Sequence, residues 1–169
     1  MQLVQLPVNI NFKQCKDMEK DHYIGVDISK RTIDIAIYVK SQAKKGTFPH
    51  ETFSNTEEGF KDMKKWLRKQ HVVLSKSLFC MEATGNYTYE LCLFLEQLGV
   101  AYSIQSPLHL KRSFGLTHGK NDKVDASRIA YYAYLHREDI KLSKFASDSV
   151  RKLKALIVER KSLVVEIAR

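Results

Sequence analysis

The sequence has few cysteines, and they show no pairing pattern. Only three are present, Cys15, Cys80 and Cys92, and no two of them have C-x-x-C spacing. An odd number of cysteines without such spacing argues against a disulfide framework and against a zinc site, and it is typical of a reducing cytosol. We interpret Cys80 and Cys92 as small hydrophobic side chains of the core.

Long apolar runs and glycine-rich loops are also missing. No stretch approaches the roughly 20 apolar residues that a membrane-spanning helix needs. The first residues, MQLVQLPVNI, lack the basic region and the sustained apolar core of a signal peptide. We therefore predict a cytoplasmic protein without a membrane partner. The 7 glycines form no GxGxxG run, which disfavours a sugar-kinase-like ATPase, although such an enzyme could also begin with GVDISK.

Acidic residues are outnumbered by basic ones. The chain has 19 Asp and Glu against 28 Lys and Arg, which gives a net charge of +9. This excess favours a polyanionic partner, but charge alone does not separate DNA, RNA and an anionic membrane. A soluble protein that happens to be basic is the other interpretation. The 169 residues are enough for one domain with its own core.

The apolar pattern predicts an α/β domain. Alternating or continuous apolar residues predict strands at 22–28, 32–39, 51–54, 77–83 and 100–106. Helical periodicity follows Asn55, with Phe60, Met63, Trp66 and Leu67 on one face, and returns at 87–98, 108–116 and 122–136. Asn55 and Glu58 resemble a capping box, and Gly99 is placed to end the second helix. This order, β-β-β-α-β-α-β-α-α, is that of an RNase H-like mixed sheet flanked by helices.

The last segment has a different pattern. Between Ser149 and Arg169, apolar residues recur near a heptad spacing, interleaved with Arg and Lys: Val150, Leu153, Ile157, Val164 and Ile167. This spacing predicts a long helix that could form a coiled coil. A helix packed on its own domain explains the pattern equally well.

Four acidic residues lie where apolar structure breaks off. Asp27 lies near the end of the first predicted strand and Glu82 near the end of the fourth, and ligands of open α/β sheets gather at the carboxyl ends of strands. Asp122 and Asp125 share one face of a predicted helix, one turn apart. Because neighbouring carboxylates repel one another unless a cation joins them, we predict a site for a hard divalent ion such as Mg²⁺.

Each of these acids also has a structural explanation. Asp27 could cap the turn that follows it, and Glu82 could be exposed just beyond its strand. Asp122 with Asp125 could form an acidic first turn that interacts favourably with the helix dipole.

Other candidates for the site are weaker. We expect Asp34 to face solvent from the second strand, and Asp21 to be a turn residue. The 6 histidines include no i, i+4 pair, which disfavours a zinc hydrolase. Only His118 lies near the pair of aspartates in the sequence.

Four motifs together resemble a known family. GVDISK, MEATGNY, SPLHLKRSFG and KNDKVDASRIA, in this order and spacing, are similar to the amino-terminal half of the IS-one-ten transposases. These are DEDD-type insertion-sequence recombinases, and the group includes the Piv pilin-gene invertases. The resemblance covers about residues 22–169, and its specificity rests on the joint presence of all four motifs.

The resemblance implies a RuvC-like fold in the RNase H-like superfamily and a bacterial or archaeal source. By motif position, Asp27, Glu82, Asp122 and Asp125 would be the catalytic, metal-binding DEDD tetrad. They would hold one or two ions of Mg²⁺ or Mn²⁺. Two such ions stabilise both the attacking and the leaving oxygen of a phosphoryl transfer.

The resemblance also implies nucleic-acid partners. Family members use a structured non-coding RNA, the bridge RNA, to choose target and donor DNA, and we expect the full-length protein to form a homodimer or tetramer. Basic residues in and beside the motifs are expected to contact phosphates: Lys30, Lys111, Arg112, Lys120, Lys123 and Arg128.

Family proteins continue past a helical linker into a second domain, whose serine is the proposed nucleophile. This sequence contains no match to that domain, so we expect the chain to be unable to recombine DNA alone. We expect 1–20 to be an extension, 21–147 the RuvC-like domain, and 148–169 the start of the linker. Two alternatives stay open: a stand-alone RuvC-like Holliday-junction nuclease, and a non-catalytic RNA-binding and dimerisation module.

Overall fold

A computed structural model describes most of the central part of the chain. The described residues are 20–39, 48–83, 85–114 and 122–144, with six further residues, 156, 157, 159, 160, 163 and 164. The expected extension lies outside them except for Lys20, as does the loop with His118. The six residues near the end are helical, but the rest of the predicted long helix falls outside the described part. Within that part, no helix is both long and apolar enough to cross a membrane.

Five strands form one mixed sheet, and all five were predicted. Its strand order is β3-β2-β1-β4-β5, and the strands are β1 (His22–Ile28), β2 (Thr32–Val39), β3 (His50–Ser54), β4 (Ser77–Glu82) and β5 (Ala101–Gln105). The first three form an antiparallel meander, whereas β4 and β5 run parallel to β1. β1 and β4 read as continuous apolar runs because both faces of the central strands are covered.

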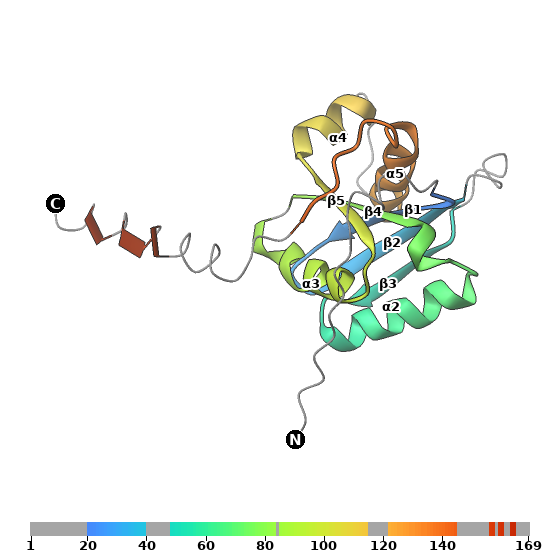
Figure 1. Ribbon diagram of the computed structural model, residues 1–169, viewed down its shortest axis with the longest axis horizontal. Helices are drawn as coiled ribbons and strands as arrows, with labels where there is room; N and C mark the ends of the chain where they lie inside the picture. The colour runs from blue at the N-terminus through green and yellow to red at the C-terminus, as the bar shows by residue number, and fades with distance from the viewer. Residues whose placement is uncertain are drawn as a thin grey trace, which may run out of the picture.

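Helices cover both faces of the sheet (Figure 1). Two helices lie on one face, α2 (Glu57–Lys69) and α3 (Tyr89–Gln97), and two on the other, α4 (Pro107–Phe114) and α5 (Asp122–Leu135). Short 3-10 turns precede β4 and α3, and the second of them spans Gly85–Thr88. The structure therefore confirms the predicted helices, with shorter bounds for α3, and the predicted residues 115 and 116 of α4 lie outside the described residues.

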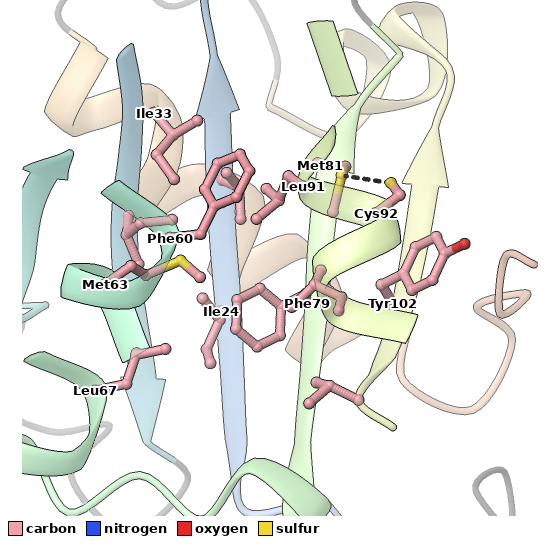
Figure 2. Close-up of a cluster of buried hydrophobic side chains, with 14 of the residues drawn as sticks. Ile24, Ile33, Phe60, Met63, Leu67, Phe79, Met81, Leu91, Cys92 and Tyr102 are labelled. Atoms are coloured by element: carbon pink, nitrogen blue, oxygen red, sulfur yellow. Dashed lines mark hydrogen bonds between the residues drawn. The ribbon is translucent and has the colours of Figure 1, made fainter. Parts of the chain in front are cut away.

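The larger core lies between the sheet and the helices α2 and α3 (Figure 2). Phe60, Met63 and Leu67 lie on the buried side of α2, as their spacing predicts. They face apolar side chains from the strands, among them Ile24 and Phe79, which are fully buried. Trp66, which was expected on the same face, is only partly buried and packs at the edge of this core.

The prediction that Asn55 caps α2 is wrong. The N-cap is Thr56, whose hydroxyl accepts a hydrogen bond from the backbone N–H of Gly59 at 3.3 Å. The amide of Asn55 is turned away from the helix and donates to two distant carbonyls. The prediction for Gly99 is confirmed, because it has a left-handed φ of 68° and directly follows Leu98, the C-cap of α3.

Cys80 and Cys92 should not react with alkylating reagents in the folded protein. Both are fully buried, which confirms their assignment to the core, and burial raises the pKa of each thiol to about 12. Because the thiolate is the reactive form, iodoacetamide near pH 8 should leave both unmodified until urea is added, as measured by peptide mass spectrometry. Rapid labelling of either thiol in native protein would contradict the packing described here.

Candidate functional site

Asp27 and Glu82 lie side by side on neighbouring parallel strands. The register of β1 and β4 pairs His22 with Ser77 and continues to Val26 beside Met81. Asp27 and Glu82 are the next residues in this register, and adjacent strands are about 4.8 Å apart. Both side chains are half-buried. The structure therefore brings together two of the four predicted acids, at the carboxyl ends of their strands.

Both acids are on the face of the sheet that α5 covers. On β1, Tyr23 lies four residues before Asp27 and belongs to the core cluster that includes residues of α5. On β4, Cys80 lies two residues before Glu82 and belongs to the same cluster. Side chains at even spacing along a strand share a face. The two acids therefore lie on the opposite face of the sheet from α2 and α3.

The direction of α5 brings its first turn to the same end of the sheet. The ring of Tyr23 lies 5.4 Å from that of Tyr134 near the end of α5. Further along β1, Gly25 lies against the backbone of Ala126 and Ala130. The helix thus runs antiparallel to β1, and its first residues lie nearest to the carboxyl end of that strand.

Asp122 and Asp125 are on that first turn. α5 begins at Asp122, whose side chain is outside the described part of the structure. Asp125 is half-buried and lies 3.4 Å from a guanidinium nitrogen of Arg128, one turn further along α5. Among the side chains that are described, no group of three or more His, Cys, Asp or Glu could hold a metal ion. The helix therefore places its first turn, with both aspartates, at the end of the sheet where Asp27 and Glu82 lie. Among the described residues, these acids do not complete a cluster of metal ligands.

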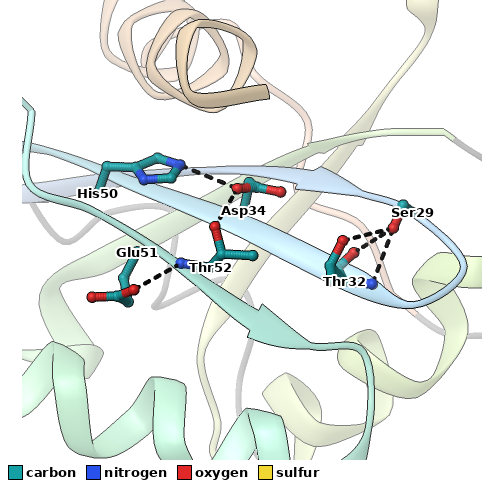
Figure 3. Close-up of polar contacts among 6 residues, drawn as sticks. All are labelled: Ser29, Thr32, Asp34, His50, Glu51 and Thr52. Carbon is teal, nitrogen blue, oxygen red and sulfur yellow. Dashed lines mark hydrogen bonds and ion pairs between the residues drawn. The ribbon is translucent and has the colours of Figure 1, made fainter. Parts of the chain in front are cut away.

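The prediction that Asp34 faces solvent is wrong. Asp34 is only 8% exposed, and it accepts a hydrogen bond of 2.6 Å from the hydroxyl of Thr52. The Nε2 atom of His50 lies 3.3 Å from the same carboxylate oxygen (Figure 3). The alternation of β2 was read correctly, but the second face is buried from Asp34 to Tyr38, and α5 packs against this strand.

Asp34 belongs to a polar row that crosses the whole sheet. It is the register partner of Asp27 on one side and of Thr52 on the other, and Glu82 is the partner of Gln105. Residues directly opposite each other on adjacent strands share a face. The sequence did not reveal this row, because each strand contributes a single polar residue and the register is fixed only by the folded sheet.

The structure describes four of the six basic side chains that were predicted to contact phosphates. Lys30 is exposed in the turn between β1 and β2, and Lys111 and Arg112 are exposed on α4. Arg128 is already engaged with Asp125. The side chains of Lys120 and Lys123 lie outside the described residues. Arg31, for which the sequence predicted no phosphate contact, is exposed next to Lys30.

The chemistry of Asp27 and Glu82 fits a hard divalent cation. Carboxylate oxygens are the protein ligands that Mg²⁺ prefers, and the ion is usually held by one or two carboxylates together with waters and substrate phosphates. Two adjacent acids at strand ends, beside exposed lysine and arginine side chains, provide such a set. The remaining ligands would then come from α5 and from a bound phosphate.

Comparison with a solved structure supports the fold. Residues of this chain superpose on T. thermophilus RuvC, solved in complex with a Holliday junction substrate, with a TM-score of 0.51 and 9% sequence identity. The match covers 71% of this chain and 98% of that chain. At this identity the likeness concerns the fold alone, which is the RuvC-like form of the RNase H fold.

Comparisons of sequence identify the family. The pilin gene-inverting proteins of Moraxella bovis and Moraxella lacunata are each 32% identical to this chain over 141 residues. These matches cover 82% of this chain but only 41% of each relative, so the chain spans about two fifths of their length. The model of the IS110 DEDD family, described as transposase, matches residues 24–169. This chain therefore belongs to the IS110 family of DEDD transposases.

Proposed function

We propose that this chain is the metal-binding catalytic domain of a DNA transposase. In this proposal Asp27, Glu82, Asp122 and Asp125 hold one or two ions of Mg²⁺ or Mn²⁺ against a DNA phosphate. The observation that carries the proposal is the adjacent register of Asp27 and Glu82 at the carboxyl ends of parallel strands. The first turn of α5 lies at the same end of the sheet, on the face that carries both acids.

The residues of the chain would perform three tasks in this reaction. Asp27 and Glu82 hold their carboxylates on a rigid sheet, so that little reorganisation is needed when a phosphate arrives. The first turn of α5 supplies Asp122 and Asp125. Arg128 balances part of the negative charge through its contact with Asp125. Bound Mg²⁺ would stabilise the charge that develops on the attacking and leaving oxygens of a phosphodiester.

Basic residues near the site would guide nucleic acid to it. Lys30 is the third residue after Asp27 in the sequence. Lys111 and Arg112 are exposed on α4, the helix that follows β5. Each phosphate that such residues neutralise releases counterions and makes binding dependent on salt. We further propose that Lys120, Lys123 and Arg128 contribute, and that a structured guide RNA directs the protein to its DNA.

The proposal is limited to part of the reaction. Because the chain spans 41% of the length of its curated relatives, we assign to it the metal-binding step and not strand exchange as a whole. Assembly as a homodimer or tetramer is proposed only for a protein of the full length of these relatives.

Metal binding in the presence and absence of DNA tests the proposal. We expect Mg²⁺ or Mn²⁺ to bind weakly to the protein alone, because few ligands come from protein, and more tightly when phosphates complete the shell. Isothermal titration calorimetry should compare the protein, a duplex DNA, and their complex. Heat from the complex that exceeds the sum of the two separate titrations is the expected result.

Two outcomes would contradict the proposal. One is the lack of any metal binding beyond that of the DNA itself. The other is tight binding to the protein alone that persists in Asp27→Asn, since the ion would then be held elsewhere.

Titration with a four-way junction in place of the duplex measures whether branched DNA is preferred.

A further inference from the structure

One asparagine side chain joins the two loops that follow the candidate metal ligands. Nδ2 of Asn55 donates to the backbone carbonyl of Ser29 at 3.0 Å and to that of Tyr87 at 3.1 Å. Ser29 is the second residue after Asp27, and Tyr87 is the fifth residue after Glu82. A single amide group therefore bridges the segments that leave β1 and β4 directly beyond the two acids.

The position of Asn55 is itself fixed by the backbone around it. Its own N–H donates to the carbonyl of Arg31 at 2.9 Å. The next residue, Thr56, caps α2. Gly59 packs so closely on Ser54 that a Cβ there would overlap the Ser54 carbonyl. The amide is thus held between the end of β3 and the start of α2, neither of which contains a predicted metal ligand.

The turn after β1 is also rigid on its own. The hydroxyl of Ser29 lies 2.9 Å from that of Thr32 and accepts from the Thr32 N–H at 3.0 Å (Figure 3). By contrast, the turn after β4 contains Gly85 with a φ of 62° and open space where a Cβ would be. The residues Gly85–Thr88 form a 3-10 turn, and Asn55 links this turn to the one after β1.

We propose that Asn55 is a positioning residue for the metal site. Its two hydrogen bonds hold the ends of β1 and β4 in the register that keeps Asp27 beside Glu82. Groups that orient metal ligands in this indirect way change metal affinity by about 10- to 100-fold when they are lost. This inference rests on the proposed function, because it assumes that Asp27 and Glu82 bind the ion.

Asn55→Asp is the most informative substitution. It keeps the shape of the side chain but replaces the N–H donor with an oxygen that faces two carbonyl oxygens. The other oxygen, Oδ1, is buried and accepts no hydrogen bond from the residues that the structure describes. A buried charge without a donor is strongly unfavourable, so the turn after β4 should separate from the turn after β1.

The test is a titration of the complex of protein and duplex DNA with Mn²⁺, followed by the electron paramagnetic resonance signal of the free ion and corrected for binding to the DNA alone. We expect Asn55→Asp to weaken Mn²⁺ binding at least about 10-fold. Asn86→Asp is the matched control, because it places the same new charge on an exposed side chain of the turn after β4, which Asn55 contacts. It should leave the affinity as in the wild type, since no ligand loses its support. Asn55→Ala, which removes the bonds without adding a charge, serves if Asn55→Asp fails to fold.

The outcomes separate this inference from the proposed function. If Asp27→Asn abolishes Mn²⁺ binding but both Asn55 variants bind as the wild type does, the positioning role is wrong and the metal site stands. If Asp27→Asn binds normally, the proposed function itself is wrong. An equal loss in Asn86→Asp and Asn55→Asp would also refute the positioning role, because Asn86→Asp breaks neither of the two hydrogen bonds of Asn55.

Discussion

Asp27→Asn is expected to weaken Mn²⁺ binding by at least about 100-fold, the upper end of the losses found when only a supporting group is removed. The substitution keeps the size of the side chain but removes the charge and one of two adjacent carboxylates at the strand ends. Glu82→Gln should have an effect of the same order, because the two acids occupy equivalent positions on neighbouring strands.

The stability of Asp27→Asn should distinguish a functional acid from a structural one. Asp27 is the register partner of Asp34 on β2, and like charges directly opposite each other destabilise a sheet. We therefore expect the thermal unfolding midpoint to stay the same or rise. If Asp27 merely caps the turn after β1, the substitution should lower stability and leave metal binding unchanged.

Matched substitutions on the other face of the molecule control for net charge. Asp62→Asn and Glu57→Gln make the same chemical changes on the exposed side of α2, where each acid forms a salt bridge with a lysine of its own helix. Both should bind Mn²⁺ as the wild type does. A similar loss in these variants would mean that the overall charge, and not a local site, attracts the ion.

Gly25→Ala is expected to lower the free energy of unfolding by about 3 kcal/mol, the upper end of the usual effect of overpacking. A Cβ at this position would overlap the carbonyl oxygen of Ala126 and the amide nitrogen of Ala130. These are backbone atoms, so no side-chain rotation can relieve the clash. The whole of α5 would have to move away from β1, and the first turn with Asp125 would move with it.

Urea denaturation measures this effect, and Gly85→Ala provides the comparison. Gly85 has open space where a Cβ would be, but its φ is 62°, so only the left-handed backbone penalty of about 1–2 kcal/mol applies. Gly25→Ala should therefore be the more destabilised of the two variants, and the folded fraction should also bind Mn²⁺ more weakly. A smaller loss than in Gly85→Ala would show that α5 does not pack as closely as described.

Much of the fold could be predicted because local patterns decide it. The alternation of apolar residues over 32–39 and the continuous apolar run over 22–28 each match a strand of the structure. Gly99 ends a helix because few other residues adopt its left-handed conformation. In such cases a few neighbouring residues contain the whole physical reason, and no distant contact is required.

The site was predicted less completely, since it depends on which segments meet. By itself the sequence determined the strands, the helices and the family motifs, and it singled out Asp27 and Glu82 as acids at strand ends. Only the tertiary structure decided that these two acids share a register and a face. It also decided that Asp34 is buried beneath α5, and that the Asn55 side chain bridges two turns and leaves the helix cap to Thr56. Alternation along a strand tells which residues share a face, but what covers that face is set by elements far away in the chain.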